Sequence, residues 1–559
     1  MLAPARAGNV GARVTGTSGD MRAAPQGGRR ARRPFVRAFF ACWAIVFALS
    51  ALWAIATPLM ASPDEPSHVI QAAAVVRGQV VGPPSSQYPG ATEVVVPRWV
   101  ADSRTLPNCF TPDPAVPADC ARWPGHDQTP VDWVTTSTLN SPVAFFIAGL
   151  PTLFLSGAPA FYAMRLVLAL LTSGLIASAF AALQQTRGRF ASIGLAAATT
   201  PVALYLGGMV NPSGVEIAAA IAATSWGALL VTRRAEGSRR WWWVAAFLVA
   251  VFFLCNTRSI ALGWLAAIIL LLFFLVDREV GRELLRSVAG RVAVGGTALI
   301  AVVSAAYFVL PKGISSTAPP QTSNTPLDTF SWMLDNTFDY ASGWVGKFGW
   351  LDTPTLGWVV VLWSAIAGML ALAALAYGSP RSRWAVAGLL GGLALVPAVS
   401  QALLVKDWGF VWQGRYTLAL FSITVLAAAV ALDRRFPGAR TARTIRPLAI
   451  ASAVALAVAQ LVSFAWALRR FSIGISIEKN WFALLTAPQW QPKVPPVVLI
   501  VAFAAVLVAG LLLALRRRLR RETEPALAQD HPAYVTSSHS PSTGPIGRRS
   551  LGGSTPEAD

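Results

Sequence analysis

The chain has 559 residues, of which 54% are hydrophobic and 13% are charged, and its net charge is +20. A soluble domain is about 25% charged, so the composition excludes an ordinary soluble protein. Apolar runs of roughly 18 residues or more, enough to cross a bilayer, recur along the chain. Because these runs are continuous and not alternating, they favour an all-α, polytopic transmembrane helix bundle over a β-barrel.

The positive charge lies mainly between the apolar runs, in clusters of arginine. These clusters alternate with loops that are poor in Lys and Arg, as the positive-inside rule expects of cytoplasmic segments. The charge therefore indicates orientation in a lipid bilayer and not a nucleic-acid partner. We predict a multi-pass protein of the cytoplasmic (cell) membrane with both termini in the cytoplasm.

The chain divides into three parts by composition. Residues 1–34 are predicted to be a disordered, basic cytoplasmic arm, 35–515 the transmembrane bundle, and 516–559 a tail that is first basic and then disordered. Two long loops of the bundle, 61–141 and 311–355, carry more acids than Lys and Arg. We expect both loops on the outer side, where they form a small cap.

Thirteen apolar segments are present in the predicted bundle. They run over 35–60, 142–156, 160–183, 190–210, 213–231, 241–256, 259–276, 292–310, 357–377, 384–404, 415–432, 447–467 and 494–515. Two cytoplasmic termini require an even number of crossings. The segment 142–156 is the shortest and begins at a proline, so we predict a half-helix or interfacial segment there and twelve crossings. Thirteen crossings would require an outer C-terminus, which the arginines after the last segment oppose.

Two of the four cysteines, Cys109 and Cys120, share the first outer loop. A loop outside the cytoplasm permits a disulfide between them, and the sequence leaves the paired and the unpaired states open. No Cys-x-x-Cys motif or Cys/His cluster predicts a metal site.

An acidic motif, Ser62 to His68, follows the first span directly. Pro66 suits the first turn of a helix, so a short helix is expected from Pro66 to Arg77, stopped by Gly78. Asp64 and Glu65 then lie at the helix N-terminus. One interpretation is a stabilising role, because acids favour this position by about 0.3–1 kcal/mol. The other is a catalytic or metal-binding pair at the membrane surface.

Further polar residues lie at or near the outer ends of predicted spans, where membrane proteins place few charges. They are Arg165, Glu216, Arg258, Lys406, Asp407, Gln413, Arg415 and Tyr416. Each singly is typical of a snorkelling or paired side chain. Together they bring Arg and Lys to the face where the positive-inside rule expects few cations. The pattern therefore predicts a binding site for an anionic ligand at the outer surface.

Three motifs carry a family resemblance. Pro63 to His68 resembles the PDEP-x-H signature of a bacterial membrane-protein family defined as a domain of unknown function. The run 140–142 resembles its second motif, with serine at the usual first proline, and 413–416 is similar to the third. The resemblance covers about 35–435. The family itself resembles the GT-C glycosyltransferases, which take sugars from polyprenyl-phosphate carriers.

This resemblance implies a reaction and roles for residues. Asp64 would be the catalytic base and Glu65 its partner, and the two could hold a divalent cation, Mg²⁺ or Mn²⁺. The substrate-binding candidates are His68, Arg258, Lys406, Gln413, Arg415 and Tyr416. Of these, Arg415 suits the donor phosphate because its planar guanidinium binds two oxygens at once. The expected partners are a polyprenyl-phosphate-linked sugar donor and a glycan or protein acceptor of the cell envelope.

Two other functions are compatible with the sequence. A transporter or flippase of a lipid-linked glycan would place ionisable residues near the bilayer midplane and show internal repeats. The sequence has few charges at mid-span and no clear repeat. A non-catalytic protein of envelope assembly would use the two carboxylates only as helix caps.

Overall fold

The computed structural model describes residues 27–88, 90–186, 188–310, 323–437, 444–476 and 480–527. Most of the predicted basic arm and C-terminal tail, and the first part of the loop 311–355, lie outside these residues. The chain divides into two compact units, Met1–Gly510 and Leu511–Asp559. The first unit contains all elements discussed below; the described part of the second is the C-terminal part of the last helix.

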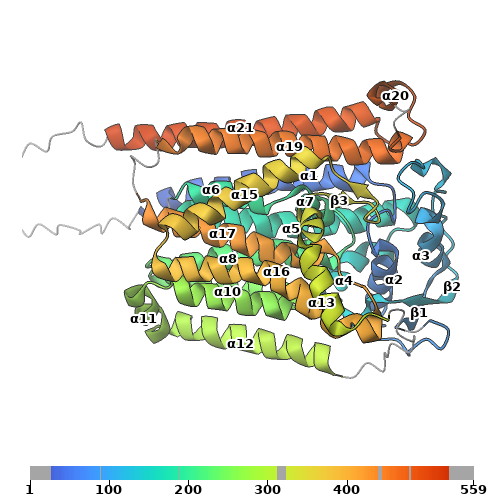
Figure 1. Cartoon of the computed structure of the whole chain (residues 1–559), viewed down its shortest axis with the longest axis horizontal. Coiled ribbons are helices and arrows are strands. Elements are labelled where there is room, and N and C mark those ends of the chain that lie inside the picture. The colour runs from blue at the N-terminus through green and yellow to red at the C-terminus, as the bar shows by residue number, and fades with distance from the viewer. Residues whose placement is uncertain are drawn as a thin grey trace, which may run out of the picture. The chain divides into compact units, whose positions relative to one another are not determined.

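The predicted polytopic helix bundle is confirmed. Within the described residues, ten helices are long and apolar enough to cross a membrane. These are α1 (Gly27–Ala56), α5 (Gly157–Gln185), α8 (Pro212–Thr232), α9 (Gly237–Cys255), α12 (Val288–Val309), α15 (Gly357–Tyr377), α16 (Pro380–Trp408), α17 (Leu418–Arg435), α19 (Arg446–Ile473) and α21 (Pro496–Leu527). In the first unit these helices run side by side along the horizontal direction of Figure 1.

Two further predicted crossings are bent helix pairs. The helices α6 (Phe190–Ala198) and α7 (Pro201–Gly207) meet at 60°, and α10 (Ala261–Leu275) and α11 (Arg278–Arg286) meet at 118°. Pro201 interrupts the first pair because proline has no N–H for the helical ladder. If each bent pair is one span, the described residues contain twelve candidate spans, the number predicted from the sequence.

The short apolar segment after the first loop forms α4 (Pro142–Gly149) and the 3₁₀ turn η4 (Leu150–Leu153). A helix rises about 1.5 Å per residue, so α4 spans less than half of the roughly 30 Å hydrocarbon core. The segment 142–156 is therefore too short to cross as a helix, which fits the predicted half-helix or interfacial segment.

Short elements gather at one end of the bundle. They include α2 (Glu65–Val75), α3 (Arg98–Asp102), α13 (Pro326–Asp335), α14 (Thr337–Val345), the 3₁₀ turn η5 (Gly414–Thr417) and α20 (Trp481–Thr486). Two antiparallel ribbons also lie there, β1 (Thr92–Pro97) with β2 (Pro130–Thr135), and β3 (Lys347–Phe348) with β4 (Thr353–Pro354). We call this the loop end. The opposite end carries α11 and is called the arginine end (Figure 1).

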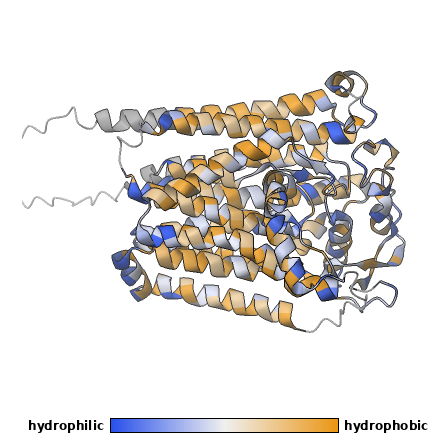
Figure 2. Ribbon diagram, viewed as in Figure 1, coloured by the Kyte–Doolittle hydropathy of each residue, from blue (hydrophilic) through white to orange (hydrophobic). Residues whose placement is uncertain are grey.

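Hydropathy and burial rank the helices differently. Figure 2 shows apolar residues along most helices and hydrophilic residues at α11 and among the loop-end elements. Yet 94% of the apolar window of α8 is buried, whereas only 11% of that of α12 is. Helix α8 is surrounded by α5, α9 and α17, and its many alanines permit this close packing. The centre of the bundle is therefore α8 and α17.

A buried arginine ties the two loops to the bundle. Arg470 of α19 donates hydrogen bonds to the carbonyls of Phe110, Asp113 and Val116 at 2.7–3.0 Å. It also pairs with the carboxylate of Asp352 at 2.7 Å. The same part of the first loop contains a disulfide between Cys109 and Cys120, with Cα atoms 6.1 Å apart. The described loop segments therefore form a cap anchored to α19.

The arrangement of charge predicts which end faces the cytoplasm. In a background with Cys42→Ser and Cys255→Ser, we expect Gly125→Cys at the loop end to react with a membrane-impermeant maleimide on sealed cells. Arg282→Cys in α11 should react only after permeabilisation, because arginine-rich segments stay inside. The opposite labelling pattern would reverse the predicted orientation.

Candidate functional site

Asp64 adopts an unusual backbone conformation at the N-terminus of α2. Its φ of 60° is in the left-handed region, which costs a non-glycine residue about 1–3 kcal/mol. Asp64 is the N-cap residue, but its side chain makes no capping hydrogen bond to the helix. The helix begins at Glu65, one residue earlier than predicted, because proline is tolerated throughout the first turn. Asp64 instead directs its carboxylate to Arg415 of η5.

Glu65 points to a different partner. Its carboxylate accepts two hydrogen bonds from Arg165 of α5, at 2.7 and 2.6 Å, and both side chains are 1% exposed. The other N–H groups of Arg165 donate to the carbonyls of Ala54, Thr57 and Pro58 at 2.8–2.9 Å. All five donors of this guanidinium are therefore satisfied. The ion pair fastens the turn between α1 and α2 to α5.

Arg415 is buried but only partly satisfied. It is 5% exposed, and one nitrogen, Nη2, binds Asp64. Its Nε and Nη1 are buried without a hydrogen-bond partner among the described residues. Leaving a buried donor unpaired costs about 1–3 kcal/mol, and more for a charged group. The Asp64 side chain is 45% exposed, so an accessible carboxylate lies beside buried guanidinium donors that have no partner in the described part of the chain.

A second arginine lies close to this pair. The guanidinium carbon of Arg258 is 4.1 Å from the ring centroid of Tyr416, a cation–π contact, and its Nη1 is 3.4 Å from the hydroxyl of Ser213. Arg258 also contributes to the electrostatic field at Asp64. Arg258, between α9 and α10, and the adjacent Arg415 and Tyr416 of η5 thus converge at the loop end from two distant parts of the chain.

Burial and nearby charges shift the pKa values of Asp64 and His68. Burial by itself raises the pKa of Asp64, but the neighbouring Arg415, together with Arg258, lowers it below its ordinary value. Burial lowers the pKa of His68 to about 3, although Asp64 opposes this shift. His68 is therefore neutral at pH 7, and its Nδ1 lies 2.8 Å from the hydroxyl of Ser137. It is a hydrogen-bonding group and not a cation.

The predicted site residues are only partly brought together. Asp64, Arg258, Arg415 and Tyr416 converge, whereas Lys406 is exposed near the end of α16 and acts electrostatically on Asp328 of α13. Within the described ranges, no hydrogen bond or ion pair joins Lys406 to Asp64. Lys406 lies nine residues before Arg415, but the end of α16 separates it from η5.

Some contacts of the site could not be predicted from the sequence. Ser137, which holds His68, is an ordinary polar loop residue in the sequence. Glu216 is visible as a charge in an apolar run, but its partner is not: the indole of Trp264 donates to it at 2.6 Å. Glu216 is 2% exposed and lies in α8, where it contributes to the field at Arg258.

The residues around Asp64 do not fit a divalent cation well. Asp64 and Glu65 are each paired with an arginine and do not share a ligand position. In the part of the chain that the structure describes, no group of three or more His, Cys, Asp and Glu could hold a metal ion. Mg²⁺ and Mn²⁺ prefer several oxygen ligands, so this donor set suits an anion better.

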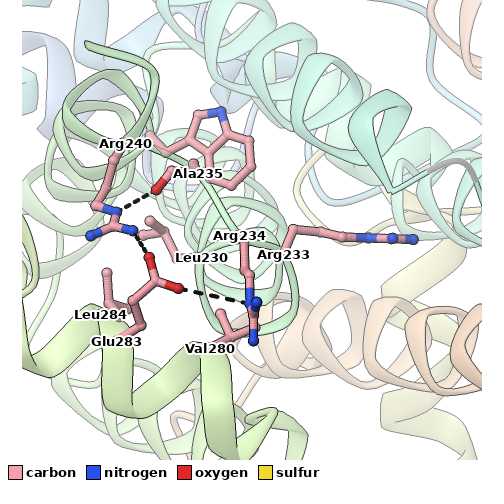
Figure 3. A pocket seen from close by; sticks show the side chains of 9 residues that line it. Leu230, Arg233, Arg234, Ala235, Arg240, Val280, Glu283 and Leu284 are labelled. Carbon is pink, nitrogen blue, oxygen red and sulfur yellow. Dashed lines mark hydrogen bonds and ion pairs between the residues drawn. The ribbon is translucent and has the colours of Figure 1, made fainter. Parts of the chain in front are cut away.

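A pocket at the arginine end provides a contrast. Figure 3 shows the carboxylate of Glu283 between Arg240 and Arg234, with Leu230 and Val280 beside them. Arg240 also donates to the carbonyl of Ala235 at 2.5 Å. The volume of this pocket is about 10 Å³, roughly the room for one water molecule. Glu283 is paired with both Arg234 and Arg240, which indicates a structural role for this carboxylate.

A protein-family model matches most of the chain. The model of a family described as "Predicted membrane protein (DUF2142)" matches residues 47–425, well over half of the chain. The matched range includes Asp64, Arg258 and Arg415. No curated protein matches the chain.

The buried ion pair predicts a large loss of stability when one partner is removed. Glu65→Gln or Arg165→Met should lower the free energy of unfolding by about 3–5 kcal/mol, because the remaining charge is left buried and unpaired. Thermal unfolding of the detergent-solubilised protein measures this effect. Arg234→Met, which removes the exposed ion pairs of Arg234 with Glu279 and Glu283, is the control and should change little. Equal melting temperatures for all variants would contradict the assigned role.

Proposed function

The chain belongs to this family of multispan membrane proteins, and on that premise we propose that it is a GT-C-type glycosyltransferase. It would transfer a sugar from a polyprenyl-phosphate carrier to an acceptor of the cell envelope, on the outer face of the cytoplasmic membrane. The observation that carries the proposal is the pairing of accessible Asp64 with buried Arg415, which has two nitrogens without partners. A carboxylate beside unused guanidinium donors suits deprotonation of an alcohol next to a bound phosphate.

The proposed reaction needs one base and one anion site. The acceptor hydroxyl attacks the anomeric carbon of the donor, and its proton moves to the carboxylate of Asp64. The bond between the anomeric carbon and the phosphate oxygen breaks, and its electron pair leaves with the phosphate. Arg415 donates hydrogen bonds to that phosphate through Nε and Nη1, and Arg258 adds positive charge. Phosphate is a good leaving group, so the mechanism needs no strong general acid.

Binding of the donor phosphate also raises the pKa of Asp64, the proposed base. In the free protein, Arg415 keeps the pKa of Asp64 low, which favours the ionised form but weakens the base. A phosphate bound to Arg415 offsets part of this positive charge. The pKa of Asp64 then rises toward its ordinary value, so the carboxylate becomes more basic when the donor is in place. Glu65 is a positioning residue in this proposal, because Arg165 engages both of its oxygens.

The position of the ionisable residues favours this proposal over a flippase. Glu216 lies in the first turns of α8, and Arg165 lies in the first third of α5. Both helices begin at the loop end, so these buried charges lie nearer to the loop end than to the middle of the bundle. A transport pathway would require polar groups deeper in the bundle.

Replacement of the proposed base should abolish transfer. Asp64→Asn keeps the shape of the side chain but cannot accept the proton, so we expect a loss of about 10²–10⁴-fold in rate. The assay follows sugar release from a panel of polyprenyl-phosphate sugars by the purified protein. Asp335→Asn, an exposed carboxylate in α13, is the matched control and should keep full activity. Normal turnover by Asp64→Asn would contradict the role of Asp64 as the base. If the unaltered protein turns over none of the donors, the proposed enzymatic function is contradicted.

The dependence of transfer on pH should respond to Arg415. Arg415 lowers the pKa of Asp64, so Arg415→Met raises that pKa and leaves the base protonated up to a higher pH. The acidic limb of kcat/KM against pH should therefore move to higher pH in Arg415→Met, in addition to a fall in rate. An acidic limb that stays in place would mean that another group is the base.

A further inference from the structure

A cavity of about 100 Å³ lies next to the Asp64–Arg415 pair. Its lining includes Pro63, Arg415, Gln413, Trp412, Tyr340 and Lys347. One water needs roughly 10–15 Å³ of such space, so the cavity has room for several waters or for a small ring in their place. It is therefore much larger than the pocket at the arginine end.

Two polar groups of this lining are unused. The Oε1 of Gln413 and the Nε1 of Trp412 are buried, and neither has a hydrogen-bond partner among the described residues. Trp412 is 9% exposed. Buried polar groups are almost always paired in native proteins, so an unpaired acceptor and an unpaired donor in one cavity wall need an explanation.

The backbone of this wall is held rigidly. The fully buried Gln401 of α16 donates to the carbonyl of Gly409 at 2.7 Å and accepts from the amides of Val411 and Trp412 at 3.0 and 2.8 Å. Gly414 lies close to α14, because a Cβ there would be 2.1 Å from the carbonyl oxygen of Tyr340. The segment that carries Trp412 and Gln413 is thus fixed before any ligand arrives, which lowers the entropy cost of binding.

The cavity is almost neutral apart from Arg415. The other charged residue in its lining, Lys347, is paired with Asp339 at 3.1 Å. The lining therefore contains the cation Arg415, which pairs with Asp64, together with a hydrogen-bond acceptor on Gln413, a donor on Trp412 and the aromatic residue Tyr340. Aromatic rings beside well-placed polar groups are typical of small-molecule sites.

We infer that this cavity is the subsite for a neutral monosaccharide attached to phosphate. In this inference, which rests on the proposed function, Arg415 binds the phosphate of the carrier. Gln413 accepts a hydrogen bond from one sugar hydroxyl, and Trp412 donates one to another. Donors with an uncharged sugar are therefore preferred over the bare carrier and over donors whose sugar carries a carboxylate or an ammonium group.

Binding measurements on the full-length protein in lipid nanodiscs test the inference. The probes are polyprenyl phosphate alone and the same lipid carrying a neutral hexose. The unaltered protein should bind the glycosylated lipid at least tenfold more tightly. Gln413→Met should reduce that preference about fivefold to tenfold by weakening only the glycosylated lipid, since one hydrogen bond is lost. Arg415→Met should weaken both probes.

Two further variants keep the test independent of folding. Trp412→Phe retains the aromatic packing but removes the N–H group, and should also weaken only the glycosylated lipid. Gln87→Met, at an exposed loop position, should bind as the unaltered protein does. Loss of both probes in Gln413→Met, or equal affinity of the unaltered protein for the two lipids, would overturn the sugar subsite and leave the proposed function standing. Failure of the unaltered protein to bind either lipid would overturn both.

Discussion

The ion pair between Glu65 and Arg165 is the contact on which the loop end depends. Two charges removed from water are expensive, and they are stable only when their hydrogen-bonding capacity is filled. Here the guanidinium uses all five donors, on Glu65 and on carbonyls at the end of α1. The amide of Val210 also donates to Glu65 at 3.3 Å. The pair thereby joins α1, α2, α5 and the turn between α7 and α8, and it holds the turn in which Asp64 takes its left-handed conformation.

A comparison of two buried arginines separates stability from function at this end of the molecule. Arg165 has every donor satisfied, whereas Arg415 leaves two nitrogens unpaired although it is equally buried. Each unpaired donor costs free energy, and within the described residues Arg415 has two of them, whereas the structural Arg470 has one. Active sites commonly retain such unfavourable groups when a ligand completes them. The same reasoning applies to Trp412 and Gln413, directly before η5, because each has a buried polar atom without a hydrogen-bond partner among the described residues.

The site is assembled from both halves of the chain. Asp64 follows the first span, Arg258 lies between α9 and α10, and Arg415 precedes α17. In a membrane bundle, segments between spans are confined to one surface or the other, so distant loops on the same side are brought into proximity. This confinement explains how polar residues in short turns build a common site. Lys406 also lies at the loop end, but it is on the exposed face of α16. There it lies near Asp328 and not near Asp64.

The sequence alone specifies the helix bundle, its crossings and the short segment 142–156, because hydropathy and length are local properties of each segment. It also marks Asp64, Glu65, Arg258 and Arg415 as polar residues in unusual positions. The tertiary structure decides how they pair: Glu65 with Arg165, and Asp64 with Arg415. It also decides that α8 lies at the centre and α12 at the edge, although both are apolar. These outcomes depend on contacts between residues that are far apart in the chain, and no local pattern encodes which distant side chain will satisfy a buried charge.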